Sequence, residues 1–131
     1  MTKLPTPAGR YTVLIKGIAV GYSELEDLDP SLGRARGRFR PGVGYDLVQP
    51  VFRLFTEAVP SRGADVVDPK KLERYHQARD ALGLSLEDDT GRTIRTSAIH
   101  IADYSKWWGG TIEIEVLISD PAYWSARSKS T

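Results

Sequence analysis

The chain has 131 residues, of which 40% are hydrophobic and 27% charged, and its 18 Lys and Arg against 17 Asp and Glu leave a formal net charge of +1. This length is typical of one domain, the hydrophobic fraction excludes an intrinsically disordered chain, and the balanced charge excludes a strong overall field for nucleic acid or a membrane. Cysteine is absent, which excludes disulfides, thiolate nucleophiles and cysteine zinc sites.

The beginning of the chain shows no targeting signal. Residues 1–10 contain two prolines and no apolar stretch, and no segment approaches the about 20 apolar residues of a membrane helix. We therefore expect a cytoplasmic protein that does not enter a membrane. It should form one α+β domain over residues 1–131, with flexible tails at 1–9 and 126–131.

Strand patterns dominate the next part of the chain. Residues 11–22 (YTVLIKGIAVGY) are rich in β-branched and aromatic types and apolar on nearly both faces, which predicts one central strand covered on both sides. Residues 23–42 follow as two polar arms around the turn signal DPSLG at 29–33. This pattern predicts a long hairpin or an ordered loop with strand character.

Two adjacent helices are predicted next. Asp46 and Gln49 have the spacing of a capping box. They precede an apolar stripe at helical spacing, whose central members we expect to be buried: Leu47, Val51, Leu54, Phe55 and Ala58. The second helix should cover 69–82, because Asp68 is a typical N-cap before Pro69 and Gly83 is a typical C-terminal residue. The linker between the helices, 60–67, is too short to separate two domains.

Further strands are predicted after the helices. Residues 84–87 and 92–104 should pair across the turn signal at 88–91, and a shift in apolar phase indicates a bulge near Ser97. Residues 111–119 alternate apolar and polar types, which is typical of a strand with one face in water. Asp120 and Pro121 should begin a short turn that carries Tyr123 and Trp124.

The order of these elements predicts the fold class. Strands, two adjacent helices and strands again, without βαβ alternation, predict an α+β fold. The expected architecture is a mainly antiparallel sheet of four to five strands with the two helices packed on one face. The doubly apolar segment 11–22 should then gain its second cover from a partner subunit or from a curled hairpin.

Four arginines at alternate positions are the most unusual feature of the sequence: Arg34, Arg36, Arg38 and Arg40. On an extended chain they would project from one face at a spacing of ~6.6 Å, as in an anion-binding ladder. The acids just before the turn, Glu24, Glu26, Asp27 and Asp29, would face them across a hairpin. We favour internal ion pairs over ligand binding, and the spacing of the acids lacks the pattern of a calcium loop, so no metal site is predicted.

Aromatic and histidine side chains supply the remaining candidates. Trp107 and Trp108 lie in a loop that ends in glycines, where one ring should close the core and the other is open to stacking on a ligand. His100 precedes Asp103 by three residues, but residues three apart on a strand point to opposite faces. A hydrogen-bonded, half-buried histidine is therefore favoured over a general base.

No nucleophile elbow, phosphate loop, dinucleotide fingerprint or metalloprotease motif occurs in the sequence, and no cofactor is predicted. We expect a non-catalytic binding or assembly domain that associates with itself, as a homodimer, or with another protein. One alternative is a small enzyme or a pocket for an acidic small molecule that uses His100 and arginines. The other is single-stranded nucleic acid bound along the arginines with a tryptophan, which the net charge disfavours.

Overall fold

The computed structural model describes residues 9–59, 67–105 and 110–128, and within them it shows an α+β fold built on two antiparallel sheets. The first sheet contains, in spatial order, β5 (Arg40–Pro41), β2 (Ile18–Ser23), β1 (Tyr11–Ile15), β6 (Leu84–Glu87) and β7 (Thr93–Ile94). The second contains β3 (Asp27–Asp29), β4 (Arg34–Arg38), β9 (Ile112–Ile118) and β8 (Thr96–Asp103). The predicted fold class is confirmed, with the strands divided between two sheets.

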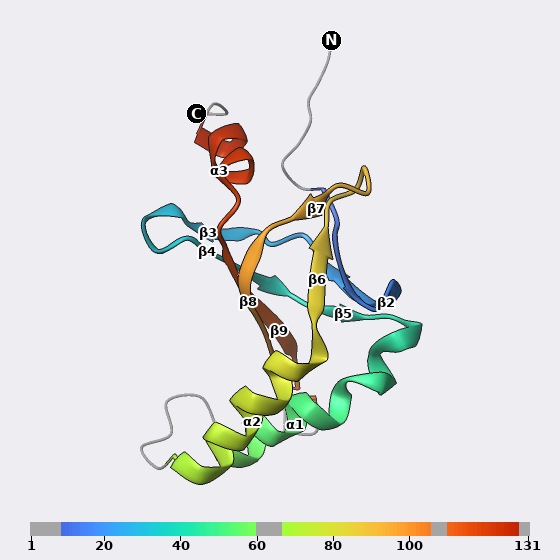
Figure 1. Cartoon of the computed structure of the whole chain (residues 1–131), viewed down its shortest axis with the longest axis vertical. Helices are drawn as coiled ribbons and strands as arrows, with labels where there is room; N and C mark the ends of the chain where they lie inside the picture. Colours follow the sequence, from blue (N-terminus) through green and yellow to red (C-terminus); the bar gives the residue numbers. More distant parts are fainter. Residues whose placement is uncertain (1–8, 60–66, 106–109, 129–131) are drawn as a thin grey trace.

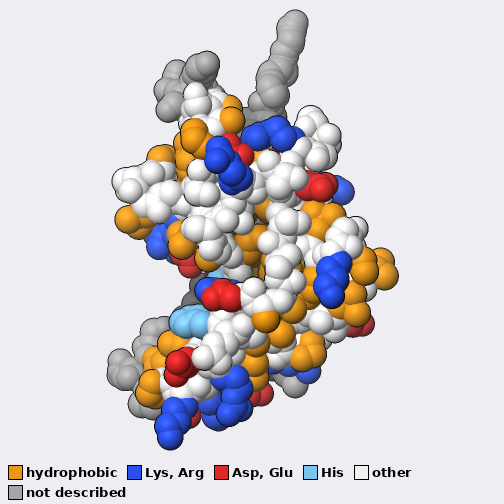
Figure 2. Space-filling view, viewed as in Figure 1, with side chains coloured by type: hydrophobic (Ala, Val, Ile, Leu, Met, Phe, Trp, Pro, Cys, Tyr) orange, Lys and Arg blue, Asp and Glu red, His pale blue; other side chains and the backbone are white. Residues whose placement is uncertain are grey.

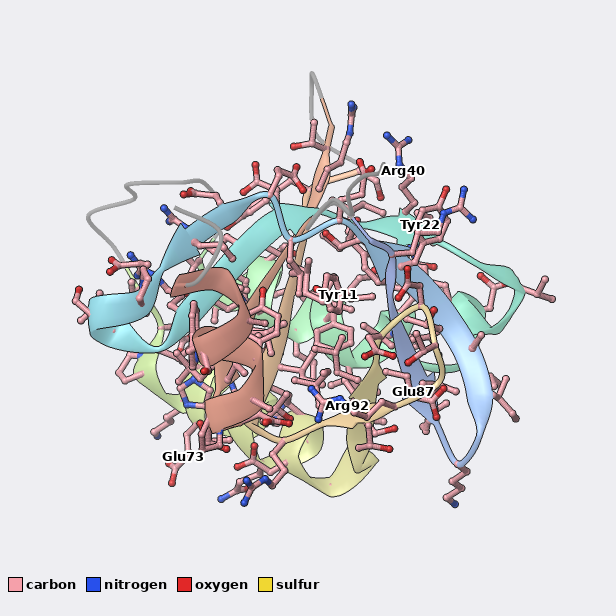
Figure 3. The ribbon with its side chains drawn as sticks, turned by 90° about the horizontal axis from the view of Figure 1, so that it is seen from above. Tyr11, Tyr22, Arg40, Glu73, Glu87 and Arg92 are labelled. Atoms are coloured by element: carbon pink, nitrogen blue, oxygen red, sulfur yellow. The ribbon has the colours of Figure 1, made fainter. Side chains whose placement is uncertain are left out.

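The core lies between the two sheets. One cluster of buried side chains joins Val13 and Leu86 of the first sheet to Ala35 and Val116 of the second. Figure 3 shows Tyr11 in the interior, whereas Tyr22 lies on the outside beside Arg40. The helices α1 (Gln49–Ala58) and α2 (Pro69–Leu82) pack against each other at one end of the sheets (Figure 1).

The prediction of one strand over residues 11–22 is wrong, because the chain reverses in its middle. Lys16 and Gly17 have φ angles of 50° and 79°, and Ile15 pairs with Ile18 across this two-residue turn. Two consecutive positive φ angles are typical of the tight turns that suit the twist of a hairpin. The apolar residues on both sides of the turn therefore come from two paired strands.

The hairpin predicted from the polar arms is confirmed, since β3 pairs with β4 across the short 3-10 helix η1 (Pro30–Leu32). The bulge predicted near Ser97 is also confirmed, because the register of β8 against β9 shifts between Thr96 and Ala98. Residues 84–87 and 93–94 pair as expected around the turn at 88–91, but the single strand expected over 92–104 divides into β7 of the first sheet and β8 of the second.

The second helix has the predicted bounds, and the Asp68 side chain accepts hydrogen bonds from the backbone N–H groups of Lys70 and Lys71. The capping box predicted for the first helix is wrong. Residues Val43–Leu47 form a separate 3-10 helix, η2, and Val48 is the N-cap of α1.

The late start of α1 also changes which of its faces is buried. Val48 and Phe52 are fully buried, and Thr56 continues the same face at intervals of four residues. Leu54 and Phe55 are only partly buried, so the prediction that both lie in the core is wrong. Leu47 lies on η2 and is 60% exposed, so it is not part of the helical stripe.

The chain ends in more regular structure than predicted. Pro121–Ser128 form the helix α3, where only a short turn and a tail were expected. Tyr123 of this helix is buried against Tyr11, and the Asp120 carboxylate accepts a hydrogen bond from the Ala122 backbone N–H. The remaining tail residues 1–8 and 129–131, and residues 60–66 of the linker, lie outside the described residues. Of the helices described, none is long and apolar enough to cross a membrane.

Candidate functional site

The four candidate arginines do not form one ladder. Arg34, Arg36 and Arg38 alternate along β4 with the buried Ala35 and the partly buried Gly37, so they share the outer face of the second sheet. The next residue, Phe39, is buried, and its backbone N–H donates to Ile112. Arg40 then pairs with Tyr22 in the other sheet. The period-two pattern therefore holds for three arginines and is interrupted before the fourth.

Two of the predicted ion pairs are present among the described residues, and they join β4 to the acids of β3. A carboxylate oxygen of Asp29 lies 3.5 Å from a guanidinium nitrogen of Arg34, and the corresponding distance between Asp27 and Arg36 is 3.0 Å. Both pairs stand at directly opposed positions of the hairpin. On the other side of β4, Glu115 lies 3.4 Å from Arg34. These pairs are partly or largely exposed, so each contributes only about 0–1 kcal/mol to stability.

The face around these arginines carries more negative than positive charge. The pairing registers place four carboxylates beside them, and Glu26 adds a fifth by accepting a hydrogen bond from the Arg38 backbone N–H. The four are Asp27, Asp29, Glu113 and Glu115. Within the described residues, five carboxylates thus oppose three guanidinium groups, which is unfavourable for a polyanion.

His100 is a half-buried, hydrogen-bonded histidine of β8. Its Nδ1 atom shares a hydrogen bond with the Tyr75 hydroxyl. Its ring packs edge to face against the Phe55 ring, with 4.4 Å between the ring centroids. Burial lowers the pKa of His100 to about 4, and the charges of Arg79 and His76 act in the same direction. The imidazole is therefore neutral at pH 7.

A small open pocket of about 270 Å³ lies beside His100. Arg36, Glu113 and Glu115 contribute to its lining, so an arginine and the histidine do share one pocket. Asp103 does not orient His100, because its carboxylate accepts hydrogen bonds from Tyr45, Gln49 and Ser105 instead. The other candidates, Trp107 and Trp108, lie outside the described residues.

An apolar groove of about 690 Å³ lies between β2 and η2, and we call it the β2–η2 groove. Three large hydrophobic side chains on its walls are exposed: Val43 by 100%, Leu47 by 60% and Ile18 by 49%. Figure 2 shows hydrophobic side chains on the right-hand side of the molecule, where β2 lies in Figure 1. The remaining lining residues are Arg10, Thr12, Ala19, Gly21, Tyr22, Gly42, Gly44 and Asp46.

The close approach of η2 to β2 produces this groove. The Gly42 backbone N–H donates to the Val20 carbonyl at 2.9 Å, and a Cβ on Gly44 would lie 2.5 Å from the Ala19 carbonyl oxygen. The backbone at Gly44 is therefore pressed against β2, and the preceding side chain, Val43, projects into solvent. A larger residue than glycine would move η2 away from the strand.

A buried carboxylate holds η2 from the other side. Asp103 is 4% exposed and accepts hydrogen bonds from the Tyr45 hydroxyl of η2 and from the Gln49 amide of α1. Burial by itself would raise the pKa of Asp103, but hydrogen bonds from Ser105, Tyr45 and Gln49 outweigh it and lower the pKa. The charged carboxylate thus anchors the segment that carries Val43 and Leu47.

The groove was missed by reasoning from the sequence. The sequence pattern places Leu47 in the helical stripe and Ile18 in a doubly covered strand. One local signal is present, because Val43 stands between Gly42 and Gly44 and two residues after Pro41, which is an unusual position for a core residue.

Comparisons with known proteins add no further constraint on this site. No protein-family model matches the chain, and neither a curated protein nor a solved structure matches it.

Proposed function

We propose that this chain is a non-catalytic cytoplasmic assembly domain that associates with itself through the β2–η2 groove. The observation that carries the proposal is the exposure of Val43, Leu47 and Ile18 on one surface. Contiguous apolar patches on small domains are typical of sites that bind another protein, whereas single exposed hydrophobic residues are ordinary. Removing the fully exposed Val43 from water would contribute about 1.5–3 kcal/mol to association, and Leu47, which is already partly covered, would contribute less.

The chemistry of the groove favours binding over catalysis. Among its described lining residues, the titratable side chains are Arg10, Tyr22 and Asp46, which include no base beside a nucleophile. The groove is open to solvent, so it offers contact area and does not enclose a small substrate. These features suit the hydrophobic centre of a protein interface.

Light scattering across micromolar concentrations measures the mass of the particles in solution and so tests the proposal. Two equally exposed leucines, one in the groove and one outside it, provide matched variants. Leu47 and Leu32 are each 60% exposed, but Leu32 lies on η1 beside the second sheet. We expect the wild-type chain to associate, Leu47→Lys to be monomeric and Leu32→Lys to behave as wild type. A wild-type monomer at every concentration, or equal effects of the two substitutions, would contradict the proposal.

One observation supports a second candidate, a pocket for a small acidic molecule, because His100 and Arg36 line the same pocket. Glu113 and Glu115 line it too, and their charges oppose an acidic ligand. We therefore rank this function below assembly. Titration of the chain with small carboxylic acids, followed through the NMR signals of the His100 ring, tests it: saturable shifts that are lost in Arg36→Gln would favour the pocket.

A further inference from the structure

We infer that the occupant of the β2–η2 groove is a second copy of the chain, related by a two-fold axis that places Arg10 of each copy against Asp46 of the other. This inference rests on the proposed function and adds the arrangement of the two copies. In a two-fold interface the same surface serves both partners, and when the axis runs across the middle of the groove each residue at one end meets the residue at the opposite end. The surface must therefore complement itself in charge and in shape.

The two charges of the groove stand at its opposite ends. Arg10 lies over the Tyr22 ring, 4.3 Å from its centroid, at the end of β2. Gly44 lies against Ile18 and Ala19, at the beginning of β2, and Asp46 follows two residues later. The strand from Ile18 to Tyr22 spans about 13 Å at 3.3 Å per residue. Among the residues that line the groove, the positive side chain therefore lies at one end and the negative one at the other.

Both charged groups are available to a partner. Arg10 and Asp46 are exposed, and neither makes an ion pair within the described part of the chain. A two-fold rotation at the middle of the groove exchanges its ends, so it creates two Arg10–Asp46 pairs. An arrangement that does not exchange the ends would place two guanidinium groups together and two carboxylates together, which is strongly unfavourable.

The shape of the surface fits the same arrangement. Val43 projects fully into solvent beside the hollow that it helps to line. A surface that carries both a projection and an adjacent hollow can dock on its own copy, since each Val43 enters the groove of the partner. The apolar contact then lies between the two charge pairs, where hydrophobic residues contribute most to an interface.

A charge-exchange experiment by analytical ultracentrifugation tests this arrangement. Arg10→Glu and Asp46→Lys each create two like-charge contacts, so we expect either single variant to raise the dissociation constant of the dimer at least about tenfold. The double variant restores opposite charges at both ends and should return to near the wild-type dissociation constant. Lys70→Glu, an exposed charge reversal on α2, is the matched control and should have no effect.

The outcomes separate this inference from the proposed function. If both single variants dimerise as wild type while Leu47→Lys remains monomeric, the groove is an interface but the Arg10–Asp46 arrangement is wrong. Failure of the double variant to recover, with its circular dichroism unchanged, also overturns the arrangement. A wild-type chain that stays monomeric overturns both. Arg10→Lys, which retains the charge, should dimerise and so separates charge from the contact between Arg10 and Tyr22.

Discussion

The Tyr45 hydroxyl donates a 2.5 Å hydrogen bond to the carboxylate of Asp103, and so joins η2 to β8 across the end of the core. Gln49, at the start of α1, donates to the same carboxylate oxygen at 3.1 Å. The other oxygen accepts from the backbone and the hydroxyl of Ser105. One buried charge therefore connects three segments of the chain, and the exposed Leu47 lies between its partners Tyr45 and Gln49 in the sequence.

Removal of this carboxylate should weaken both the fold and the groove. Asp103→Ala leaves the buried Tyr45 hydroxyl without its acceptor, which costs about 1–3 kcal/mol in the free energy of unfolding. Tyr45→Phe removes one donor and retains the others, so it should cost less. Urea denaturation measures both values. Equal stability of Asp103→Ala and the wild type would show that the carboxylate does not anchor η2.

The stability of the chain should fall as His100 becomes protonated. The folded-state pKa of about 4 lies below the usual unfolded value of about 6.5, so the fold favours the neutral ring. The resulting stability is complete above pH 6.5 and is lost as the pH falls from about 6.5 to about 4. The loss should reach about 3 kcal/mol, before any offset from Glu115, which lies opposite His100 in the sheet.

Urea denaturation between pH 7.5 and pH 4.5 measures this dependence on pH. His100→Gln has no ring to protonate, so its free energy of unfolding should change less over the same range. NMR titration of the wild-type ring gives an independent check. A measured pKa near 6.5 for His100 would show that the ring is accessible to water and not buried against Phe55.

Two phenylalanines of α1 should differ in their contribution to stability. Phe52 is fully buried, so Phe52→Ala should cost about 3–5 kcal/mol. Phe55 is only partly buried, although it touches Tyr75 and His100, and Phe55→Ala should cost clearly less. Thermal denaturation compares the two variants. A greater loss in Phe55→Ala would mean that the stripe expected from the sequence is the true core face.

Local signals explain which elements of the fold were predictable. The bounds of α2 follow from Asp68, Pro69 and Gly83, which act within one turn of the helix ends. The hairpin turn at Lys16 and Gly17 was hidden because apolar residues flank it on both sides, so a single long strand fitted the pattern equally well. The start of α1 was also misjudged, because Asp46 has the right spacing for a capping box yet lies in η2.

The candidate site was less predictable because it depends on contacts between distant segments. The departure of Arg40 from the arginine row follows from the burial of Phe39, which moves the chain from one sheet to the other. The exposure of Val43 follows from the contact of Gly44 with Ala19, which no spacing along the sequence encodes. The ion pairs of the β3–β4 hairpin were predictable because a short turn fixes their register.

The arginine face should not retain the wild-type chain on heparin, even at low salt. Five carboxylates surround the three arginines of β4, so the local field repels a polyanion. The variant Asp27→Asn with Asp29→Asn removes two of these charges and should gain weak, salt-sensitive retention, which makes it the positive control. Retention of the wild type that disappears in Arg36→Ser with Arg38→Ser would instead support nucleic-acid binding.

The contact between η2 and β2 can be tested with two glycines that lie two residues apart. A Cβ on Gly44 would meet the Ala19 carbonyl oxygen at 2.5 Å, whereas a Cβ on Gly42 would find its nearest neighbour at 3.5 Å. Gly44→Ala must therefore displace η2 and should cost about 1–3 kcal/mol in stability, as overpacking typically does. Gly42→Ala has ordinary contacts and an extended backbone, so it should be neutral or stabilising by about 0.4–1 kcal/mol.

The same pair of variants links the contact to assembly. Displacement of η2 moves Val43 and Leu47 relative to Ile18, so Gly44→Ala should weaken self-association more than Gly42→Ala, which adds a methyl group to the groove wall without moving η2. Urea denaturation measures the stability of each variant, and light scattering measures its association under conditions where both variants are folded. A Gly44→Ala chain that is destabilised but still associates as wild type would show that the interface does not use the β2–η2 groove.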